Sequence, residues 1–264
     1  IAMGAPWFKI QHLSEEAGLV ALSANFALYG DMSDRMMSLA AGLGPAQEIY
    51  SIDESFIDLS GVKGDLVERS HKIRARILQW VGIPCGIGIG PTKTLAKLAN
   101  HIAKTAERKP GVYPEKLAQV CNLNALEHSE RQAVFEATAV NEVWGVGRQI
   151  SKQLQAGGIH TVLDLMRLNP ATVRSKWSVV LERTVRELQG TPCIDLDHSP
   201  AAKKEIACTR SFGRPITEQH HIAEAVTEFA SRAAEKVRKQ HSLAGQVYVY
   251  IRTSPFRKDQ QYSR

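Results

Sequence analysis

The stretch that most constrains this chain is 50–60, where two adjacent carboxylates lie between two short apolar arms. The first arm covers 48–52 and the second covers 56–59. Both arms are rich in β-branched and aromatic residues, which favour β-strands. The pattern predicts an antiparallel hairpin with Asp53 and Glu54 at its tight bend.

This acidic turn needs a balancing charge. Adjacent carboxylates repel each other, and burying either one without a partner costs free energy. Hard oxygen ligands of this kind suit Mg²⁺, which proteins often hold with one or two carboxylates plus substrate phosphates. Asp53 and Glu54 are therefore candidate magnesium ligands, and a solvated acidic turn is the alternative.

The stretch 83–90 alternates strictly between apolar residues and glycine. One face carries Cys85, Ile87 and Ile89, and the other carries Gly86, Gly88 and Gly90. The alternation predicts a strand, and a glycine face leaves room for close approach. Either a packed helix or a substrate could use that room.

A helix is predicted over 92–106, with a basic stripe along one side. The stripe comprises Lys93, Lys97, His101 and Lys104, at i, i+4, i+8 and i+11. A P-loop would need Gly-Lys-Ser/Thr, whereas Thr92 precedes Lys93 here, so a Walker ATPase is rejected. If the basic stripe faces the acidic turn, the two together would form a triphosphate-binding site. The alternative is an ordinary surface helix.

Composition sets wide bounds. The 264 residues allow two or three domains, and no apolar run approaches the ~18 residues that span a bilayer. The four cysteines contain no CxxC pair, so reduced cytosolic thiols are expected rather than a zinc site. A net charge of +6 is compatible with nucleic-acid binding.

A helical region follows the Lys-Pro-Gly boundary at 109–111. Within it, a Gly-apolar-Gly turn made of Gly145, Val146 and Gly147 precedes a predicted helix that stops at 157–158. This is the helix-hairpin-helix pattern, whose backbone N–H groups can bind a DNA phosphate without reading sequence. A plain turn is the alternative.

The stretch 203–264 is predicted to contain a strand at 206–212, a long helix at 218–240 and a strand at 246–252. Two strands rarely make a stable sheet alone, so we expect this domain to be loose or incomplete.

Several motifs together carry a family resemblance. Ser-Ile-Asp-Glu followed by Ser-Phe-Ile-Asp-Leu resembles the second catalytic motif of the Y-family translesion DNA polymerases. The rest of the chain resembles the UmuC subfamily, the catalytic subunit of DNA polymerase V. The matching stretches are Gly-Ala-Pro-Trp-Phe-Lys at 4–9, Leu-Tyr-Gly-Asp-Met-Ser at 28–33, Thr-Lys-Thr-Leu-Ala-Lys-Leu-Ala-Asn-His at 92–101, Val-Trp-Gly-Val-Gly-Arg at 143–148, Val-Leu-Glu-Arg-Thr-Val-Arg-Glu-Leu at 180–188 and Arg-Ser-Phe-Gly at 210–213.

The resemblance implies an α+β polymerase hand. It places the end of the fingers at 1–26, a ferredoxin-like palm at 27–108, a helix-hairpin-helix thumb at 109–192 and an incomplete little finger at 203–264. It implies a cytoplasmic enzyme of SOS mutagenesis that performs error-prone translesion synthesis. Its implied partners are primer-template DNA, deoxynucleoside triphosphates, a UmuD′-type dimer, RecA and the sliding clamp, without a membrane.

The resemblance also assigns roles to residues. Asp53 would bridge two Mg²⁺ ions, and Glu54 would hold the ion at the primer terminus. Lys104 would contact the triphosphate of the incoming nucleotide. The residues that would contact DNA phosphates are Gly145, Val146 and Gly147 in the thumb and Arg210, Ser211, Gly213 and Arg214 in the little finger.

One departure limits this prediction. The family's first metal-binding aspartate, its steric gate and its basic fingers residues all precede the position where Ile1 aligns. We therefore expect little or no polymerase activity from this chain alone. A non-catalytic DNA-binding module is the alternative, and a nucleotide cyclase with a related palm is a further one, against which the helical stretch 143–168 argues.

Overall fold

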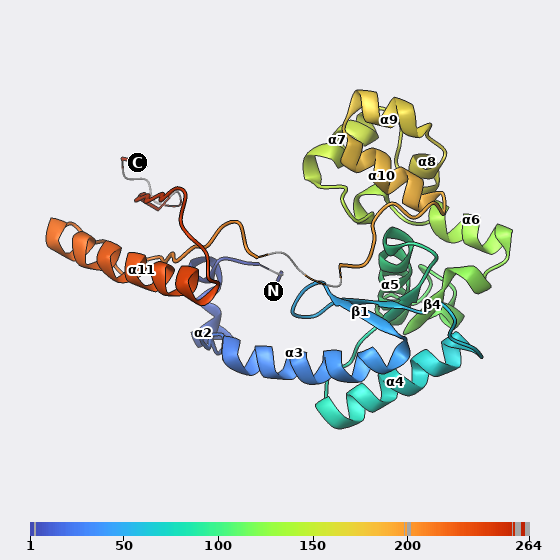
Figure 1. Ribbon diagram of the computed structural model, residues 1–264, viewed down its shortest axis with the longest axis horizontal. Coiled ribbons are helices and arrows are strands. Elements are labelled where there is room, and N and C mark those ends of the chain that lie inside the picture. The colour runs from blue at the N-terminus through green and yellow to red at the C-terminus, as the bar shows by residue number, and fades with distance from the viewer. Residues whose placement is uncertain (3, 198, 200–201, 255, 257–259, 262–264) are drawn as a thin grey trace. The chain divides into compact units, whose positions relative to one another are not determined.

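The computed structural model describes the chain except for 3, 198, 200–201, 255, 257–259 and 262–264. The chain divides into two compact units, Ile1–His198 and Ser199–Arg264 (Figure 1). Positions 198 and 200–201, at the boundary between the two units, lie outside the described residues. Among the helices that the structure describes, none has the length and apolar content to cross a membrane.

The first unit contains ten α-helices, four strands and four short 3-10 helices among its described residues. The α-helices are α1 (Trp7–Ile10), α2 (Leu13–Glu16), α3 (Phe26–Ala40), α4 (Leu66–Val81), α5 (Lys93–Arg108), α6 (His128–Glu136), α7 (Arg148–Ala156), α8 (Val162–Met166), α9 (Pro170–Lys176) and α10 (Val179–Leu188). The strands are β1 (Ala46–Ile49), β2 (Ser55–Asp58), β3 (Ile87–Ile89) and β4 (Val120–Asn122), and the 3-10 helices are η1 (Ala41–Leu43), η2 (Glu115–Leu117), η3 (Leu123–Ala125) and η4 (Val140–Glu142).

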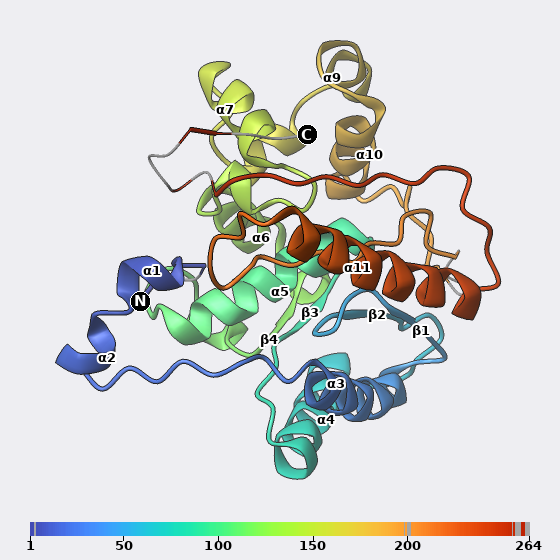
Figure 2. The same cartoon turned by 90° about the vertical axis from the view of Figure 1, so that its left-hand side faces the viewer.

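The predicted acidic hairpin is confirmed. Strands β1 and β2 pair antiparallel, from Ala46 opposite Asp58 to Ile49 opposite Ser55. Beside the hairpin, α3 and α4 pack together around a small core that contains Met36, Met37, Leu43, Ile73 and Ile77 (Figures 1 and 2). Met36 and Met37 of α3 therefore serve as core packing.

Helix α5 lies directly on the glycine face of β3 (Figure 2). This packing decides between a helix and a substrate as the neighbour of that face. A Cβ added to Gly88 would lie 2.1 Å from the backbone nitrogen of Asn100, and one added to Gly90 would lie 2.8 Å from that of Ala96. The glycines thus admit a helix rather than a substrate. The strand is also shorter than the predicted 83–90, because parallel partner β4 pairs with only three of its residues.

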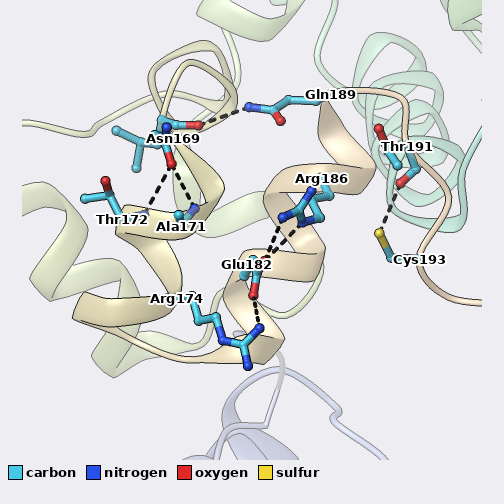
Figure 3. Close-up of polar contacts among 10 residues, drawn as sticks. Asn169, Ala171, Thr172, Arg174, Glu182, Arg186, Gln189, Thr191 and Cys193 are labelled. Carbon is cyan, nitrogen blue, oxygen red and sulfur yellow. Dashed lines mark hydrogen bonds and ion pairs between the residues drawn. The ribbon is translucent and has the colours of Figure 1, made fainter.

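The larger core joins α5 to the helices that follow it, α6 to α10. Local sequence sets their ends: Thr161 caps α8 in a capping box, and Asn169 accepts hydrogen bonds from Ala171 and Thr172 at the start of α9 (Figure 3). Between α9 and α10, the buried carboxylate of Glu182 pairs with Arg174 at 3.5 Å and with Arg186 at 2.9 Å (Figure 3).

The second unit departs from its sequence prediction. Its helix α11 (Gln219–Lys239) matches the predicted 218–240, and the side that carries Ile222, Val226 and Phe229 is half-buried. The predicted strands at 206–212 and 246–252 are wrong, since neither stretch forms a strand in the described part of the chain. Alternation of apolar and polar residues can give a strand its two faces, but its backbone hydrogen bonds must come from neighbouring strands. A sheet of only two strands is marginally stable.

Candidate active site

The turn that carries the two carboxylates is held by its own backbone. The N–H groups of Tyr50 and Ser51 both donate to the carbonyl of Glu54 at 3.0 Å. The hydroxyl of Ser51 then donates to the Asp53 carboxylate at 2.6 Å. Asp53 is exposed and Glu54 is half-buried, so the turn presents both carboxylates at one place with one open to solvent.

Helix α5 brings its basic stripe against this hairpin. Thr92 caps the helix by accepting from the N–H of Leu95 at 3.2 Å. The opposite side of the helix, which includes Leu95, Leu98 and Ile102, is buried in the larger core. Because that side is buried, two lysines of the other side point toward the hairpin.

Lys97 reaches the acidic turn. Its Nζ lies 2.7 Å from Oε2 of Glu54, and the two side chains are 21% and 33% exposed. The same ammonium group lies 4.7 Å from the ring centroid of Tyr50 and 5.6 Å from that of Trp144. Lys97 therefore touches the carboxylate and two aromatic faces at once.

Lys93 makes a more enclosed pair one helical turn earlier. Its Nζ lies 2.5 Å from Oε2 of Glu48, and the two side chains are only 9% and 10% exposed. Lys93 also donates to the carbonyl of Asp195 at 2.8 Å, while the N–H of Asp197 donates to Glu48 at 2.7 Å. This pair fastens the stretch before residue 198 to the hairpin.

The remaining two groups of the stripe lie farther along α5. His101 faces Glu142, with Nδ1 and Oε2 3.4 Å apart, and burial lowers the pKa of His101 below its usual value despite that carboxylate. The stem of Lys104 covers Gly86, where an added Cβ would lie 3.0 Å from its Cγ. Within the described residues, the Lys104 ammonium makes no hydrogen bond or ion pair, so it is available to an anion.

The donor set fits a hard divalent cation in kind. Asp53 and Glu54 supply carboxylate oxygens at one turn. The ammonium group of Lys97 already donates to Oε2 of Glu54, so this carboxylate has a cationic partner. No group of three or more His, Cys, Asp or Glu side chains able to hold a metal occurs among the described residues. The turn would therefore offer such a cation two carboxylate ligands, and Mg²⁺ sites in proteins commonly complete their coordination with water and substrate phosphates.

The predicted thumb turn lies next to the acidic hairpin. Gly145 has a φ of +88°, and Gly147 is the N-cap of α7. The side chain of Val146 is buried, and its backbone N–H donates to the carbonyl of Val143 at 3.0 Å. Trp144 beside them donates from Nε1 to the hydroxyl of Tyr50 at 3.2 Å.

The predicted little-finger residues belong to the second unit. Arg210, Ser211, Gly213 and Arg214 are all exposed and lie in a stretch without regular secondary structure, ahead of α11. The acidic turn belongs to the first unit, so these residues are described separately from it.

Sequence reasoning missed three residues around this site. Glu48 entered only as part of a predicted strand, Trp144 only as part of the motif at 143–148, and Glu187 only as part of the motif at 180–188. Glu187 is fully buried and accepts from the N–H groups of Thr94, Cys193 and Ile194 at 2.8 to 3.0 Å. An acid on the buried side of a predicted helix was the available signal, because such a carboxylate needs partners.

Comparison with known proteins identifies the family. Residues 1–101 match the impB/mucB/samB family model, and 203–264 match the model of that family's C-terminal domain. Together the two models cover more than half of the chain.

Curated relatives agree with these matches. The chain is 43% identical to the protein UmuC of Salmonella typhimurium over 99% of its length, and 39% identical to the protein MucB of Escherichia coli over its whole length. These matches cover 60% and 61% of the relatives, so the chain spans about three-fifths of their length. It is also 29% identical, over 75% of its length and 45% of the relative, to the DNA polymerase IV of Pelotomaculum thermopropionicum.

Solved structures give the same fold. A Y-family DNA polymerase chimera superposes with a TM-score of 0.69 at 20% identity, covering 90% of this chain and 65% of the other. An insertion ternary complex of Dbh DNA polymerase superposes with a TM-score of 0.56 at 19% identity, with the same coverage. The resemblance predicted from sequence is thereby confirmed: the chain belongs to the impB/mucB/samB family and has the α+β fold of the Y-family DNA polymerases.

Proposed function

We propose that this chain supplies the catalytic palm and the DNA-binding thumb of a DNA-templated DNA polymerase that performs error-prone translesion synthesis. One observation carries the proposal: the Asp53–Glu54 turn faces the basic side of α5, with Lys97 and Glu54 in contact at 2.7 Å. Nucleotidyl transfer needs this combination, with carboxylates for divalent cations and cations for phosphate charge. The relatives named UmuC and DNA polymerase IV support the proposal.

Each part of the chain has a proposed place in the hand. The proposal assigns 1–26 to the end of the fingers, 27–108 to the palm, 109–192 to the thumb and 203–264 to the little finger. In this arrangement the palm holds the acidic turn and the thumb turn lies against it through Trp144 and Tyr50.

The proposed chemistry uses magnesium, held by Asp53 and Glu54. When bound, magnesium supplies Lewis-acid stabilisation of phosphate charge and lowers the pKa of a bound hydroxyl. Ser51 keeps the Asp53 carboxylate oriented through its 2.6 Å hydrogen bond. Lys104 offers an ammonium group without a partner in the described part of the chain, which suits the triphosphate of an incoming nucleotide.

The proposed grip on DNA is by phosphates rather than bases. In the turn Gly145-Val146-Gly147 before α7, the two glycines offer backbone N–H groups, while the Val146 N–H donates to the carbonyl of Val143 at 3.0 Å. Arg210, Ser211, Gly213 and Arg214 offer an exposed basic stretch. Primer-template DNA and deoxynucleoside triphosphates are the proposed substrates. A UmuD′-type dimer, RecA and the sliding clamp are proposed partners, and a role in SOS mutagenesis in the cytoplasm is proposed with them, all on the family resemblance alone.

Primer extension tests the proposal, using the full-length gene product on undamaged templates and on templates with an abasic site. We expect Asp53→Asn to lower the extension rate by at least about 100-fold, because a lost metal ligand removes several kcal/mol of charge stabilisation. Binding to the same duplex should stay within about threefold, since DNA contacts lie elsewhere. Asp31→Asn, an exposed acid of α3 paired with Arg35, is the matched control.

The same experiment decides between the two classes of function. Unchanged extension by the Asp53→Asn protein would remove the carboxylate from the reaction. Duplex binding without extension by the wild-type protein would favour a non-catalytic DNA-binding module instead.

A further inference from the structure

Two lysines of α5 combine a carboxylate partner with an aromatic neighbour: Lys93 lies over the ring of Phe56 at 4.9 Å, and Lys97 lies over two rings and is more exposed. The Nζ of Lys97 contacts Glu54 of the acidic turn at 2.7 Å, and it lies over the rings of Tyr50 and Trp144. These three neighbours come from two distant stretches of the chain, the hairpin and the loop before α7. The tertiary structure therefore brings a carboxylate and two aromatic rings together around the ammonium group of Lys97.

The two aromatic rings that hold the ammonium are themselves fixed. Tyr50 and Trp144 meet edge to face, with centroids 5.5 Å apart and planes at 88°, and the Trp144 Nε1 donates to the Tyr50 hydroxyl. Phe56 packs against both, at 5.6 Å from Tyr50 and 5.7 Å from Trp144. A lysine over such faces gains cation–π attraction and has fewer alternative positions.

The carboxylate side of the contact is equally constrained. The backbone of the turn is closed by two hydrogen bonds to the carbonyl of Glu54, and Asp53 is engaged by Ser51. Lys97 thus neutralises Glu54, whereas Asp53 carries its charge toward solvent. A divalent cation that takes both carboxylates would compete with Lys97 for the negative charge of Glu54.

We propose that Lys97 is a built-in counter-ion of the acidic turn, which competes with a divalent cation for Glu54 and is kept in place by Tyr50 and Trp144. This inference rests on the proposed metal site at Asp53 and Glu54. Two cations on one carboxylate repel each other strongly in a partly enclosed site. The lysine therefore offsets the charge of Glu54 before the metal arrives and leaves that of Asp53, and it weakens metal binding.

The test is a titration of the full chain with Mn²⁺, followed by the electron paramagnetic resonance signal of the free ion. We expect Lys97→Met to bind Mn²⁺ about tenfold more tightly than the wild type, because the repulsion is gone and the apolar stem remains. Lys97→Arg keeps the charge and should stay within about twofold of the wild type. Lys72→Met removes one charge from an exposed pair on α4 and should change nothing.

The outcomes separate this inference from the proposed function. Unchanged or weaker Mn²⁺ binding by a Lys97→Met protein with a wild-type circular dichroism spectrum would overturn the counter-ion role. In that case, weaker binding by Asp53→Asn would still uphold the metal site. If Asp53→Asn binds as the wild type does, the metal site fails and the inference fails with it.

Discussion

Two ion pairs join the same hairpin to the same helix, yet their environments differ. The Glu48–Lys93 pair lies where the hairpin strands are paired, and the Glu54–Lys97 pair lies at the turn, one helical turn along α5. The first pair is almost enclosed, and it is further bonded to the backbone of Asp195 and Asp197. The second is partly open and has only aromatic faces beside it.

The difference separates a structural joint from an exchangeable contact. A buried charge is strongly held because its removal leaves the partner unpaired at low dielectric, whereas an open pair can trade its partner for water or another ion. The enclosed pair is continued by Glu187, whose carboxylate ties the start of α5 to 193–194. The enclosed pair and Glu187 together connect the hairpin, the start of α5 and the stretch 193–197. The open pair, by contrast, leaves the acidic turn available for binding.

Loss of one charge from the enclosed pair should have the largest effect on stability. We expect Glu48→Gln to lower the free energy of unfolding of the first unit by about 3–5 kcal/mol, because Lys93 stays buried without its partner. Urea unfolding followed by tryptophan fluorescence measures this, since Trp7, Trp80, Trp144 and Trp177 all lie in that unit.

A double variant gives the control for that measurement. Glu48→Gln with Lys93→Met removes both charges, so most of the lost stability should return. A single variant that unfolds at the wild-type urea concentration would contradict the description of this pair as a structural joint.

The same change at the open pair should have a much smaller effect. We expect Lys97→Met to lower the free energy of unfolding by less than about 1 kcal/mol, which is the usual worth of a partly exposed ion pair. The same urea titration measures it beside Glu48→Gln. Equal losses at the two sites would erase the distinction between joint and exchangeable contact.

The third position of the stripe should produce the smallest effect, visible only as a pH dependence. Burial holds the pKa of His101 below its ordinary value, so the folded state disfavours its protonation. Stability from this group is full above the unfolded pKa of ~6.5 and is lost as pH falls through the lower folded pKa. Thermal unfolding from pH 8 to pH 5 should therefore show a shallower decline for His101→Gln than for the wild type.

An exposed histidine supplies the comparison for that profile. His71→Gln, on the solvent side of α4, should follow the wild-type curve. A His101→Gln protein that declines as steeply as the wild type would show that burial of this ring does not contribute to acid sensitivity.

Much of the first unit follows from local sequence. The hairpin around Asp53 and Glu54 comes from two β-branched arms, and α5 from the apolar period of Leu95, Leu98 and Ile102 with Thr92 as its cap. The family resemblance was likewise readable, because motifs such as Ser-Ile-Asp-Glu are contiguous. Partners distant in sequence were not readable: no local rule pairs Glu48 with Lys93 or places Trp144 against Tyr50.

What the sequence by itself determined is which groups exist and which helix face or turn carries each of them. Periodicity and capping are local, so they place Lys93 and Lys97 on one stripe and the two carboxylates on one bend. Tertiary structure alone decided that one lysine is enclosed and the other open, because desolvation depends on everything packed around a charge. It also decided that the glycine face of β3 receives a helix, and that 206–212 and 246–252 form no strand, since ladders and close packing need partners from elsewhere in the chain.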